Sequence, residues 1–335
     1  MVYVLFILVA AVTLYAAMKL STFADVLSTK TSMGGMLVGT ILLAGATSLP
    51  EVTTSISAVV IGNPDIAVGN VLGSNLFNLF VLAMFDLYFR SKRLYEQIDR
   101  THLYSAILAI ILTSLALSGL LYSETPAILG VGIDMIAILI IYIIGLVYMN
   151  KKSSSSMQPV QEVPTEKTSK KKPGNPHSDI SLKRAIIGFS IAAVVIMGAG
   201  TALSILGDQI AVLTGLGSSF IGSFLIAATT SLPEAVSVYV ALRLRNVNLA
   251  FGSILGSNIF NMLILVMSDF VYREGSILNA AAESHIVTGV SITFLSLLVI
   301  YGIRRKPTTK LGTYLIPSVL TIIVYFVTTY LLFIS

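Results

Sequence analysis

Ten long apolar segments alternate with polar connections, and this pattern limits the possible folds more than any other feature of the sequence. A helix needs about 20 mainly apolar residues to cross the hydrocarbon core of a bilayer. Most segments are near that length, which predicts an all-α polytopic membrane protein with ten transmembrane helices. The predicted spans are 2–18, 34–61, 64–88, 103–121, 126–149, 184–206, 216–243, 248–271, 285–303 and 312–334.

The composition indicates the same class of protein. Of the 335 residues, 55% are hydrophobic and 11% are charged, whereas a soluble domain keeps roughly a quarter of its residues charged. The net charge of +5 does not indicate nucleic-acid binding, because the basic residues lie in connections between apolar segments. The chain has no cysteine, which excludes disulfides and thiolate metal sites. No positively charged region precedes the first apolar segment, so we expect a retained span and not a cleaved signal peptide.

Residues 150–183 form the only clearly soluble stretch of the chain. This stretch is rich in Ser, Pro and Lys and poor in core-forming residues, which is typical of a flexible linker. It separates a predicted first five-helix repeat at 1–149 from a predicted second repeat at 184–335.

Positive charge is distributed unevenly over the connections. Of the 21 Lys and Arg residues, all except Arg273 fall in connections on one side of the predicted membrane. Short cytoplasmic connections carry the excess of Lys and Arg. We therefore predict a multi-pass plasma-membrane protein whose linker lies in the cytoplasm and whose two termini lie outside.

An internal repeat relates the two halves. Residues 39–86 and 222–269 align without a gap, 183 positions apart, and both contain Thr-Ser-Leu-Pro-Glu followed by Gly-Ser-Asn-(Leu/Ile)-Phe-Asn. Because each half holds five predicted spans, the second half enters the membrane from the opposite side, and the copies are inverted. Inverted repeats are typical of transporters, with a binding site near the midplane and alternating access between the two sides.

The repeated motifs place a set of oxygen atoms inside apolar spans. Pro50 and Pro233 interrupt the helical hydrogen bonding, and local unwinding there would expose backbone carbonyls. The candidate groups are the carboxylates of Glu51 and Glu234, the hydroxyls of Thr47, Ser48, Ser74, Thr230, Ser231 and Ser257, the amide oxygens of Asn78 and Asn261, and the carbonyls of Ala44, Thr47, Ala227 and Thr230. Hard cations such as calcium and sodium prefer oxygen ligands, whereas zinc and copper prefer nitrogen or sulfur. Asp86 and Asp269 lie nearer the ends of their spans, where we expect interfacial charges or vestibule rims.

The sequences GATSLPE…GNVLGSNLFN and ATTSLPE…GSILGSNIFN resemble the two α-repeats of the cation/calcium antiporter superfamily, on its sodium/calcium exchanger branch. The resemblance implies a five-plus-five inverted fold with four ion sites between broken helices. It implies that Glu51 and Glu234 bind calcium or sodium in turn. The implied carbonyl ligands are Ala44, Ala227, Thr47 and Thr230, and the implied sodium ligands are Ser48, Ser74, Ser231 and Ser257.

The chain departs from that family at one place. Many sodium/calcium members carry Asp at one of the two positions occupied by Asn78 and Asn261. With Asn at both, the pocket holds two formal negative charges, which are enough for one calcium ion. Three sodium ions would exceed that charge by one, so the exchange stoichiometry stays open.

The predicted function is secondary antiport of calcium against sodium, with no cofactor, no nucleic acid and no obligate protein partner. The alternative within this class couples calcium to protons, with Glu51 and Glu234 as the proton carriers. A passive channel is less favoured, because channels arrange their ligands by rotational symmetry between subunits, whereas these ligands come from an inverted pair. An enzyme is least favoured, because no nucleophile–base pair accompanies the motifs.

Overall fold

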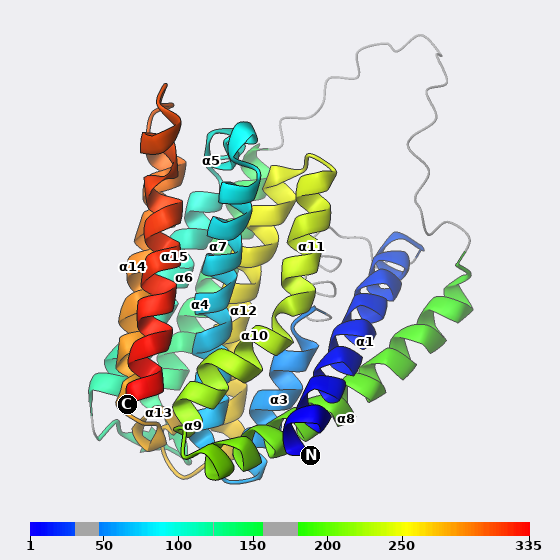
Figure 1. The fold of residues 1–335 in the computed structure, drawn as a ribbon, viewed down its shortest axis with the longest axis vertical. Helices are drawn as coiled ribbons and strands as arrows, with labels where there is room; N and C mark the ends of the chain where they lie inside the picture. The colour runs from blue at the N-terminus through cyan, green and yellow to red at the C-terminus, as the bar shows by residue number, and fades with distance from the viewer. Residues whose placement is uncertain (31–46, 123, 157–179) are drawn as a thin grey trace.

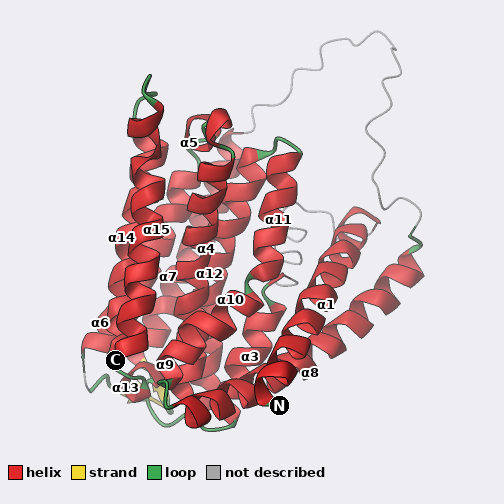
Figure 2. Ribbon diagram, in the orientation of Figure 1, coloured by secondary structure: helices red, strands yellow, loops and turns green. Residues whose placement is uncertain are grey.

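The computed structural model describes residues 1–30, 47–122, 124–156 and 180–335, and these residues are mostly helical (Figures 1 and 2). The first half contains α1 (Val2–Lys30), α3 (Leu49–Val60), α4 (Pro64–Tyr88), η1 (Arg90–Lys92), α5 (Leu94–Gln97), α6 (His102–Leu121), β1 (Ala127–Ile128), β2 (Val131–Gly132) and α7 (Ile133–Ser156). The second half contains α8 (Leu182–Thr214), α9 (Ser218–Phe220), the π-helix η2 (Ile221–Ile226), α10 (Ala227–Thr230), α11 (Leu232–Arg243), α12 (Val247–Tyr272), α13 (Ile277–Ala280), α14 (Ser284–Arg304) and α15 (Leu311–Ile334).

Seven of the described helices are long and apolar enough to cross a membrane, namely α1, α4, α6, α8, α12, α14 and α15. An eighth span forms if Ser218–Thr230 and α11 are joined across a bend of 42°. The remaining apolar helices, α3 and the Ile133–Met149 part of α7, are shorter. The fold is therefore a helical polytopic membrane fold. Residues 34–46, predicted as the first part of the second span, lie outside the described residues.

Four predicted span boundaries are wrong. Helix α7 continues to Ser156, past the predicted end at 149, and α8 continues to Thr214, past the predicted end at 206. The span predicted at 126–149 begins later, because residues 127–132 form an antiparallel hairpin and α7 starts at Ile133. The hairpin backbone bonds to the segment around the end of α12, since the Gly132 N–H donates to Asp269 and Val131 bridges Gly275. The first span does not end at residue 18 either. Helix α1 continues to Lys30, so Lys19 is an exposed residue within the helix and not part of a connection.

Helices α4 and α12 form the centre of the bundle. Of their apolar windows, 89% and 67% respectively are buried, against 28% for α1 and 22% for α8. Helix α4 packs against α12, α3, η2 and α15. Helices α1 and α8 pack side by side at one edge of the molecule (Figure 1). The centre of the fold is thus the pair of helices that carries the two Gly-Ser-Asn motifs.

The secondary structure repeats along the chain as the sequence does. Helices α3, α4 and α5 each begin 183 residues before α11, α12 and α13 respectively. Their start signals repeat as well, because the side chain of Asn63 accepts from the N–H of Ile66 at 3.1 Å and that of Asn246 accepts from Leu249 at 3.0 Å. The structural repeat therefore extends beyond residue 86 of the first copy and residue 269 of the second.

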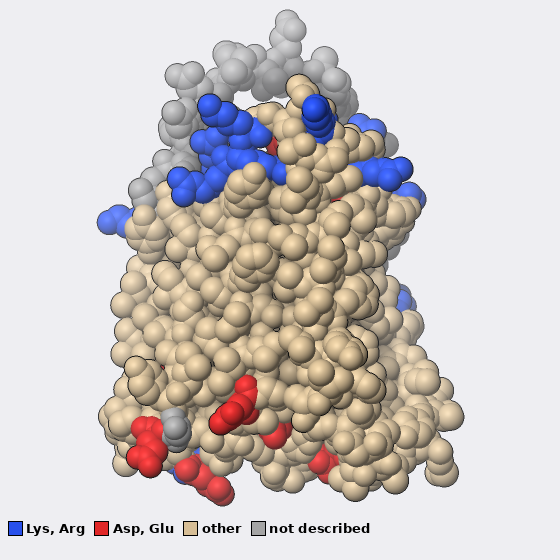
Figure 3. Space-filling model, turned by 60° about the vertical axis from the view of Figure 1, so that its left-hand side comes forward, with Lys and Arg blue, Asp and Glu red and all other residues tan. Residues whose placement is uncertain are grey.

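Charged side chains gather at the two ends of the molecule. In Figure 3, Lys and Arg lie at one end and Asp and Glu at the other, with a broad, nearly uncharged band between them. An apolar band of this kind matches the hydrocarbon core of a bilayer.

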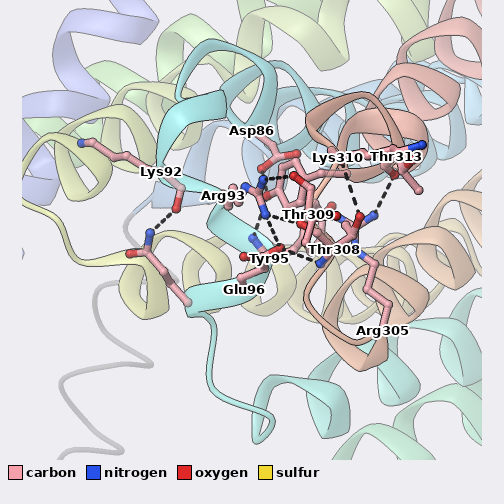
Figure 4. A network of polar contacts seen from close by, with 12 residues as sticks. Asp86, Lys92, Arg93, Tyr95, Glu96, Arg305, Thr308, Thr309, Lys310 and Thr313 are labelled. Atoms are coloured by element: carbon pink, nitrogen blue, oxygen red, sulfur yellow. Dashed lines mark hydrogen bonds and ion pairs between the residues drawn. The ribbon is translucent and has the colours of Figure 1, made fainter.

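A polar network at the basic end joins the segment after α4 to the loop between α14 and α15 (Figure 4). Arg93 donates to the carbonyl of Thr309 at 3.0 Å and to Glu96 at 3.2 Å. Glu96 in turn accepts from the N–H of Thr308 at 3.4 Å. These bonds hold the end of the central helix α4 against the C-terminal helix pair.

Candidate functional site

The two Leu-Pro-Glu motifs start helices α3 and α11, each at a break in an apolar segment. Ser48 and Ser231 occupy the N-cap positions with nearly the same backbone angles, φ −90° with ψ 11° and φ −90° with ψ 4°. The proline follows within the first two helical positions, where its missing N–H costs little. Glu51 and Glu234 consequently lie in the first turn, at the positive end of the helix dipole, and each is only 1% exposed.

Each carboxylate bonds to the other repeat. Ser231 Oγ donates to Glu51 Oε1 at 3.0 Å, and Ser48 Oγ donates to Glu234 Oε1 at 3.3 Å. Thr230 also approaches Glu51, and Thr47 approaches Glu234. The two breaks therefore meet at one place, where the same contacts occur twice in exchanged roles.

Four asparagines of α4 and α12 form a second set of contacts between the repeats. Asn78 Nδ2 donates to Asn258 Oδ1 at 2.9 Å, and Asn261 Nδ2 donates to Asn75 Oδ1 at 2.9 Å. All four side chains are 1% exposed. Ser74 and Ser257, buried at 0% and 2% exposure, lie one turn before Asn78 and Asn261 on the same helices.

Several buried oxygen atoms here have no hydrogen-bond partner within the described part of the chain. They are Glu51 Oε2, Glu234 Oε2, Asn78 Oδ1, Asn261 Oδ1 and Ser74 Oγ. Buried polar atoms normally find a partner, so a concentration of unpaired ones calls for an explanation. Oxygen atoms of carboxylates, amides and hydroxyls are the ligands that calcium and sodium prefer. This donor set therefore fits a hard cation.

Negative charge at this place is limited to the two carboxylates. Over residues 1–30, 47–122, 124–156 and 180–335, no three His, Cys, Asp or Glu side chains cluster closely enough to hold a metal ion. A cation here would rely on Glu51, Glu234 and neutral oxygens. Neutral ligands hold an ion less firmly than a cage of carboxylates does, so a bound ion could leave the site again.

The structure thus brings together Glu51 and Glu234 with Thr47, Ser48, Thr230 and Ser231. It joins Asn78 to Asn258 and Asn261 to Asn75, each across the two repeats. Ala44 lies outside the described residues. The carbonyl of Ala227 is not free, since it accepts from the Ser231 N–H at 3.0 Å and from Thr230 Oγ1 at 3.3 Å. The role of either carbonyl as a ligand stays a prediction.

Three asparagines near the site were not among the predicted site residues. Asn75 and Asn258 share the repeated Ser-Asn-(Leu/Ile)-Phe-Asn sequence with Asn78 and Asn261, so the repeat contained a signal for them. Asn70 donates to the Glu51 carbonyl at 3.2 Å, and its Oδ1 accepts from Thr230 at 3.1 Å. The equivalent position in the second repeat is Ser253, so the repeat gave no signal for Asn70.

Asp86 and Asp269 are not rim charges, which corrects the expectation from their position in the sequence. Both are fully buried and act as hydrogen-bond acceptors within the fold. Asp86 accepts from the hydroxyls of Tyr314 and Ser318, and Asp269 accepts from the N–H groups of Ile277 and Gly132. Each carboxylate therefore anchors the end of a central helix to neighbouring segments.

A close backbone approach fixes the position of α4 beside the second break. A Cβ atom added at Gly73 would lie 2.3 Å from the Ser223 carbonyl oxygen, and one at Gly69 would lie 3.0 Å from the Ser223 nitrogen. Only glycine permits helices to approach this closely. The contact presses α4, which carries Ser74 and Asn78, against η2, which leads to the break at Ser231.

Comparison with known proteins shows which families and folds the chain is similar to. A sequence model of the family described as "Sodium/calcium exchanger protein" matches residues 1–149 and 184–334. The chain is 25% identical over 305 residues to the "Putative antiporter CaxA" of Alkalimonas amylolytica, covering 90% of this chain and 91% of that protein. It is also 25% identical over 285 residues to "Inner membrane protein YrbG" of Escherichia coli (strain K12), covering 84% of this chain and 83% of that protein.

Solved structures share the fold. The H+/Ca2+ exchanger CAX has a TM-score of 0.66 at 13% identity, covering 98% of this chain and 87% of that chain. The sodium-calcium exchanger NCX_Mj has a TM-score of 0.58 at 19% identity, covering 98% of both chains. At these identities the likeness concerns the fold alone, and it includes exchangers with different counter-ions.

Proposed function

The chain belongs to the sodium/calcium exchanger protein family, and we propose that it exchanges calcium for sodium across the membrane through a pocket that we place between α3, α4, α11 and α12. The family is one of cation/calcium antiporters embedded in the membrane, so the chain is a multi-pass antiporter and not an enzyme. The counter-ion, the ligands and the orientation in the membrane are the parts that we propose.

One observation carries the proposal. Glu51 and Glu234 are each held on one oxygen by a serine of the opposite repeat, while the second oxygen of each is buried and has no hydrogen-bond partner among the residues that the structure describes. An ionised carboxylate in that state is costly unless a cation completes its surroundings. Calcium and sodium would therefore compete for the same two carboxylates, and competition for one site is what couples the two fluxes.

The proposed ligands are the oxygens that surround those carboxylates. We assign direct contact to Glu51, Glu234, Asn78 and Asn261, each of which has one buried oxygen without a hydrogen-bond partner in the described part of the chain. Ser48, Ser74, Ser231 and Ser257 are proposed sodium ligands, and Thr47 and Thr230 are proposed to contribute their remaining oxygens, as are the carbonyls of Ala44 and Ala227. The donor chemistry supports the assignment, because all of these atoms are hard oxygens.

We further propose a complete architecture of ten spans in two inverted five-helix repeats. In this arrangement the segment 150–183 is a cytoplasmic linker, and both termini lie outside. The repetition of α3, α4 and α5 as α11, α12 and α13 supports two copies, and the concentration of basic side chains at one end supports the orientation. Alternating access would then move one group of helices against the other around the central pocket.

The decisive experiment measures radioactive calcium uptake into proteoliposomes that contain the purified protein. The vesicles are loaded with sodium and diluted into sodium-free medium at a constant pH on both sides. We expect uptake that depends on the outward sodium gradient and stops when sodium is present on both sides. Uptake without any counter-ion gradient would indicate a channel and would overturn the proposal.

The same assay tests the two carboxylates. Glu51→Gln and Glu234→Gln each remove one negative charge from the pocket, so we expect calcium uptake to fall by at least a hundredfold while the protein remains folded. Glu283→Gln is the matched control, because Glu283 is an exposed residue at the N-cap of α14 and should keep wild-type uptake. Normal uptake by either pocket variant would show that the site is assigned wrongly.

Proton coupling is the second candidate. Oε2 of Glu51 and Oε2 of Glu234 have no hydrogen-bond partner over the described residues, and each could hold a proton in place of a metal cation. Vesicles loaded at acid pH, with no sodium on either side, distinguish the two candidates. Uptake driven by the proton gradient alone would move the chain to proton/calcium exchange while leaving Glu51 and Glu234 as its central residues.

A further inference from the structure

Asn75 and Asn258 occupy equivalent positions in the two repeats, at the point where α4 and α12 cross. Asn75 Nδ2 donates to the backbone carbonyl of Asn258 at 3.2 Å, and Asn258 Nδ2 donates to the backbone carbonyl of Asn75 at 3.3 Å. Each amide group is therefore fixed at its nitrogen end by the backbone of the opposite repeat. With the nitrogen fixed, each Oδ1 has a defined direction.

Those two oxygens are used to hold the next pair of amides. Asn75 Oδ1 accepts from Asn261 Nδ2, and Asn258 Oδ1 accepts from Asn78 Nδ2, both at 2.9 Å. An amide side chain has a donor end and an acceptor end, so holding the donor end turns the acceptor end to the other side. Asn78 Oδ1 and Asn261 Oδ1 are the ends that remain, and both are buried with no partner among the described residues.

We propose that Asn75 and Asn258 are positioning residues that select calcium by keeping the carbonyl ends of Asn261 and Asn78 turned toward the transported ion. The inference rests on the proposed function, since it concerns the same pocket. If an amide turns over, its NH2 group faces the ion with partial positive charge. The repulsion scales with the charge of the ion, so a turned amide disfavours calcium more than sodium.

The first test replaces Asn75 by a side chain of similar size that cannot accept a hydrogen bond. In Asn75→Leu, the Asn261 amide loses its acceptor and is free to turn over. We expect the KM for calcium to rise about tenfold, which corresponds to about 1.4 kcal/mol. The KM for sodium should rise clearly less. Equal changes for both ions would indicate a general disturbance of the pocket and would overturn the proposal.

A double-mutant cycle gives a readout that a purely structural role would not produce. Asn75 acts through Asn261, on the other repeat, and not through Asn78, its neighbour one turn away on the same helix. Once Asn261→Leu has removed the positioned amide, adding Asn75→Leu should therefore change the calcium KM by less than about twofold. In the Asn78→Leu background, the same addition should still raise the KM about tenfold. If Asn75→Leu raises the calcium KM by the same factor in both backgrounds, the proposal is wrong.

The controls separate folding from positioning. Ser291→Ala removes one side of a buried hydrogen bond to Thr328 at 2.6 Å, between α14 and α15, and should leave the ratio of the calcium and sodium KM values unchanged. If Asn75→Leu elutes as aggregate in size-exclusion chromatography, Asn75→Ala, which cannot accept a hydrogen bond either, replaces it throughout the cycle, with the same expected pattern of coupling. If the series that stays folded shows no coupling between residues 75 and 261, the proposal is wrong.

The same data distinguish failure of this inference from failure of the proposed function. If wild-type vesicles show no calcium uptake against any cation gradient, the proposed function itself is wrong. If wild-type protein exchanges ions and Glu51→Gln does not, but the Asn75–Asn261 cycle is multiplicative, only the positioning role is wrong.

Discussion

At the scale of single residues, the pocket departs from ordinary local rules. A serine at the N-cap usually accepts a hydrogen bond from its own helix. Ser48 and Ser231 make no such bond, and each gives its hydroxyl hydrogen to a carboxylate of the opposite repeat. Departures of this kind are expected where a residue serves function more than local stability.

This departure predicts how the two serines respond to substitution. In Ser231→Ala, Glu51 loses a hydrogen bond to a charged group, so we expect the apparent affinity for the transported cations to fall about tenfold, since such a bond contributes about 1.5–3 kcal/mol. Thermal stability should fall as well, because the lost bond is buried and involves a charged group. Ser181→Ala is the matched control. Ser181 does cap its helix, accepting from Arg184 at 3.3 Å, so this variant should lower stability by about 1 kcal/mol and leave transport unchanged. Uptake kinetics measure the affinity, and thermal unfolding in detergent measures the stability. An unchanged cation affinity in Ser231→Ala, or a lowered one in Ser181→Ala, would contradict the argument.

The two buried aspartates predict another difference between equivalent residues. Asp269 accepts from two backbone N–H groups, of Ile277 at 2.6 Å and Gly132 at 3.0 Å, and such groups can only donate. Asp86 accepts from two hydroxyls and from the backbone of Leu94. Its Oδ2 accepts from the Ser318 hydroxyl, which can turn round to accept from an amide. Asp269→Asn should therefore leave one buried N–H unsatisfied and lower the free energy of unfolding by about 1–3 kcal/mol. Asp86→Asn should cost less. Thermal unfolding of the two variants compares them directly, and equal losses would show that donor type does not matter here.

At the scale of secondary-structure elements, the sequence predicted most helices well because hydrophobicity and helix-breaking residues are local signals. Helix α4 begins and ends at the residues predicted, 64 and 88, and α6 and α14 each begin one residue before the predicted position. The start of α7 was wrong because the 127–132 hairpin depends on Asp269, far away in the sequence. The pairing of Asn75 with Asn261 could not be predicted for the same reason, since residue spacing does not reveal which side chains meet across two helices.

Element packing makes a prediction about Gly73. In Gly73→Ala, the new Cβ would lie within 2.3–2.7 Å of three backbone atoms of Ser223, which have no room to move aside. Helices α4 and η2 would have to separate, and Asn78 would move with α4. We expect calcium uptake to fall at least tenfold, with a lower thermal unfolding temperature.

Gly198→Ala is the control. It should be harmless or slightly stabilising, because Gly198 is exposed within α8 and a Cβ there would contact nothing among the described residues. Wild-type uptake by Gly73→Ala would show that the close approach is not needed.

At the scale of the whole molecule, the two repeats meet at one central site, and the two ends of the molecule differ. The pocket contacts occur in exchanged pairs, so the centre is nearly symmetric. The surface is not symmetric, since basic and acidic side chains gather at opposite ends (Figure 3). In the proposed antiporter, near-symmetry at the centre would let one site face the two sides of the membrane in turn. The asymmetric charge supports the proposed direction of insertion.

The uneven distribution of charge predicts the orientation of the chain in the membrane. Labelling of introduced cysteines can measure this orientation. The sequence contains no cysteine, so a single introduced cysteine reports on one place without any background. Glu274 is exposed at the acidic end, after α12, and Lys306 is exposed at the basic end, between α14 and α15. A maleimide that cannot cross membranes should label Glu274→Cys in intact cells. It should label Lys306→Cys only after the membrane is permeabilised, because connections rich in Lys and Arg remain in the cytoplasm. Both variants should retain calcium uptake, which ensures that the labelled protein is folded. The opposite labelling pattern would invert the proposed topology, placing the linker outside and both termini in the cytoplasm, and labelling of both in intact cells would contradict any single orientation.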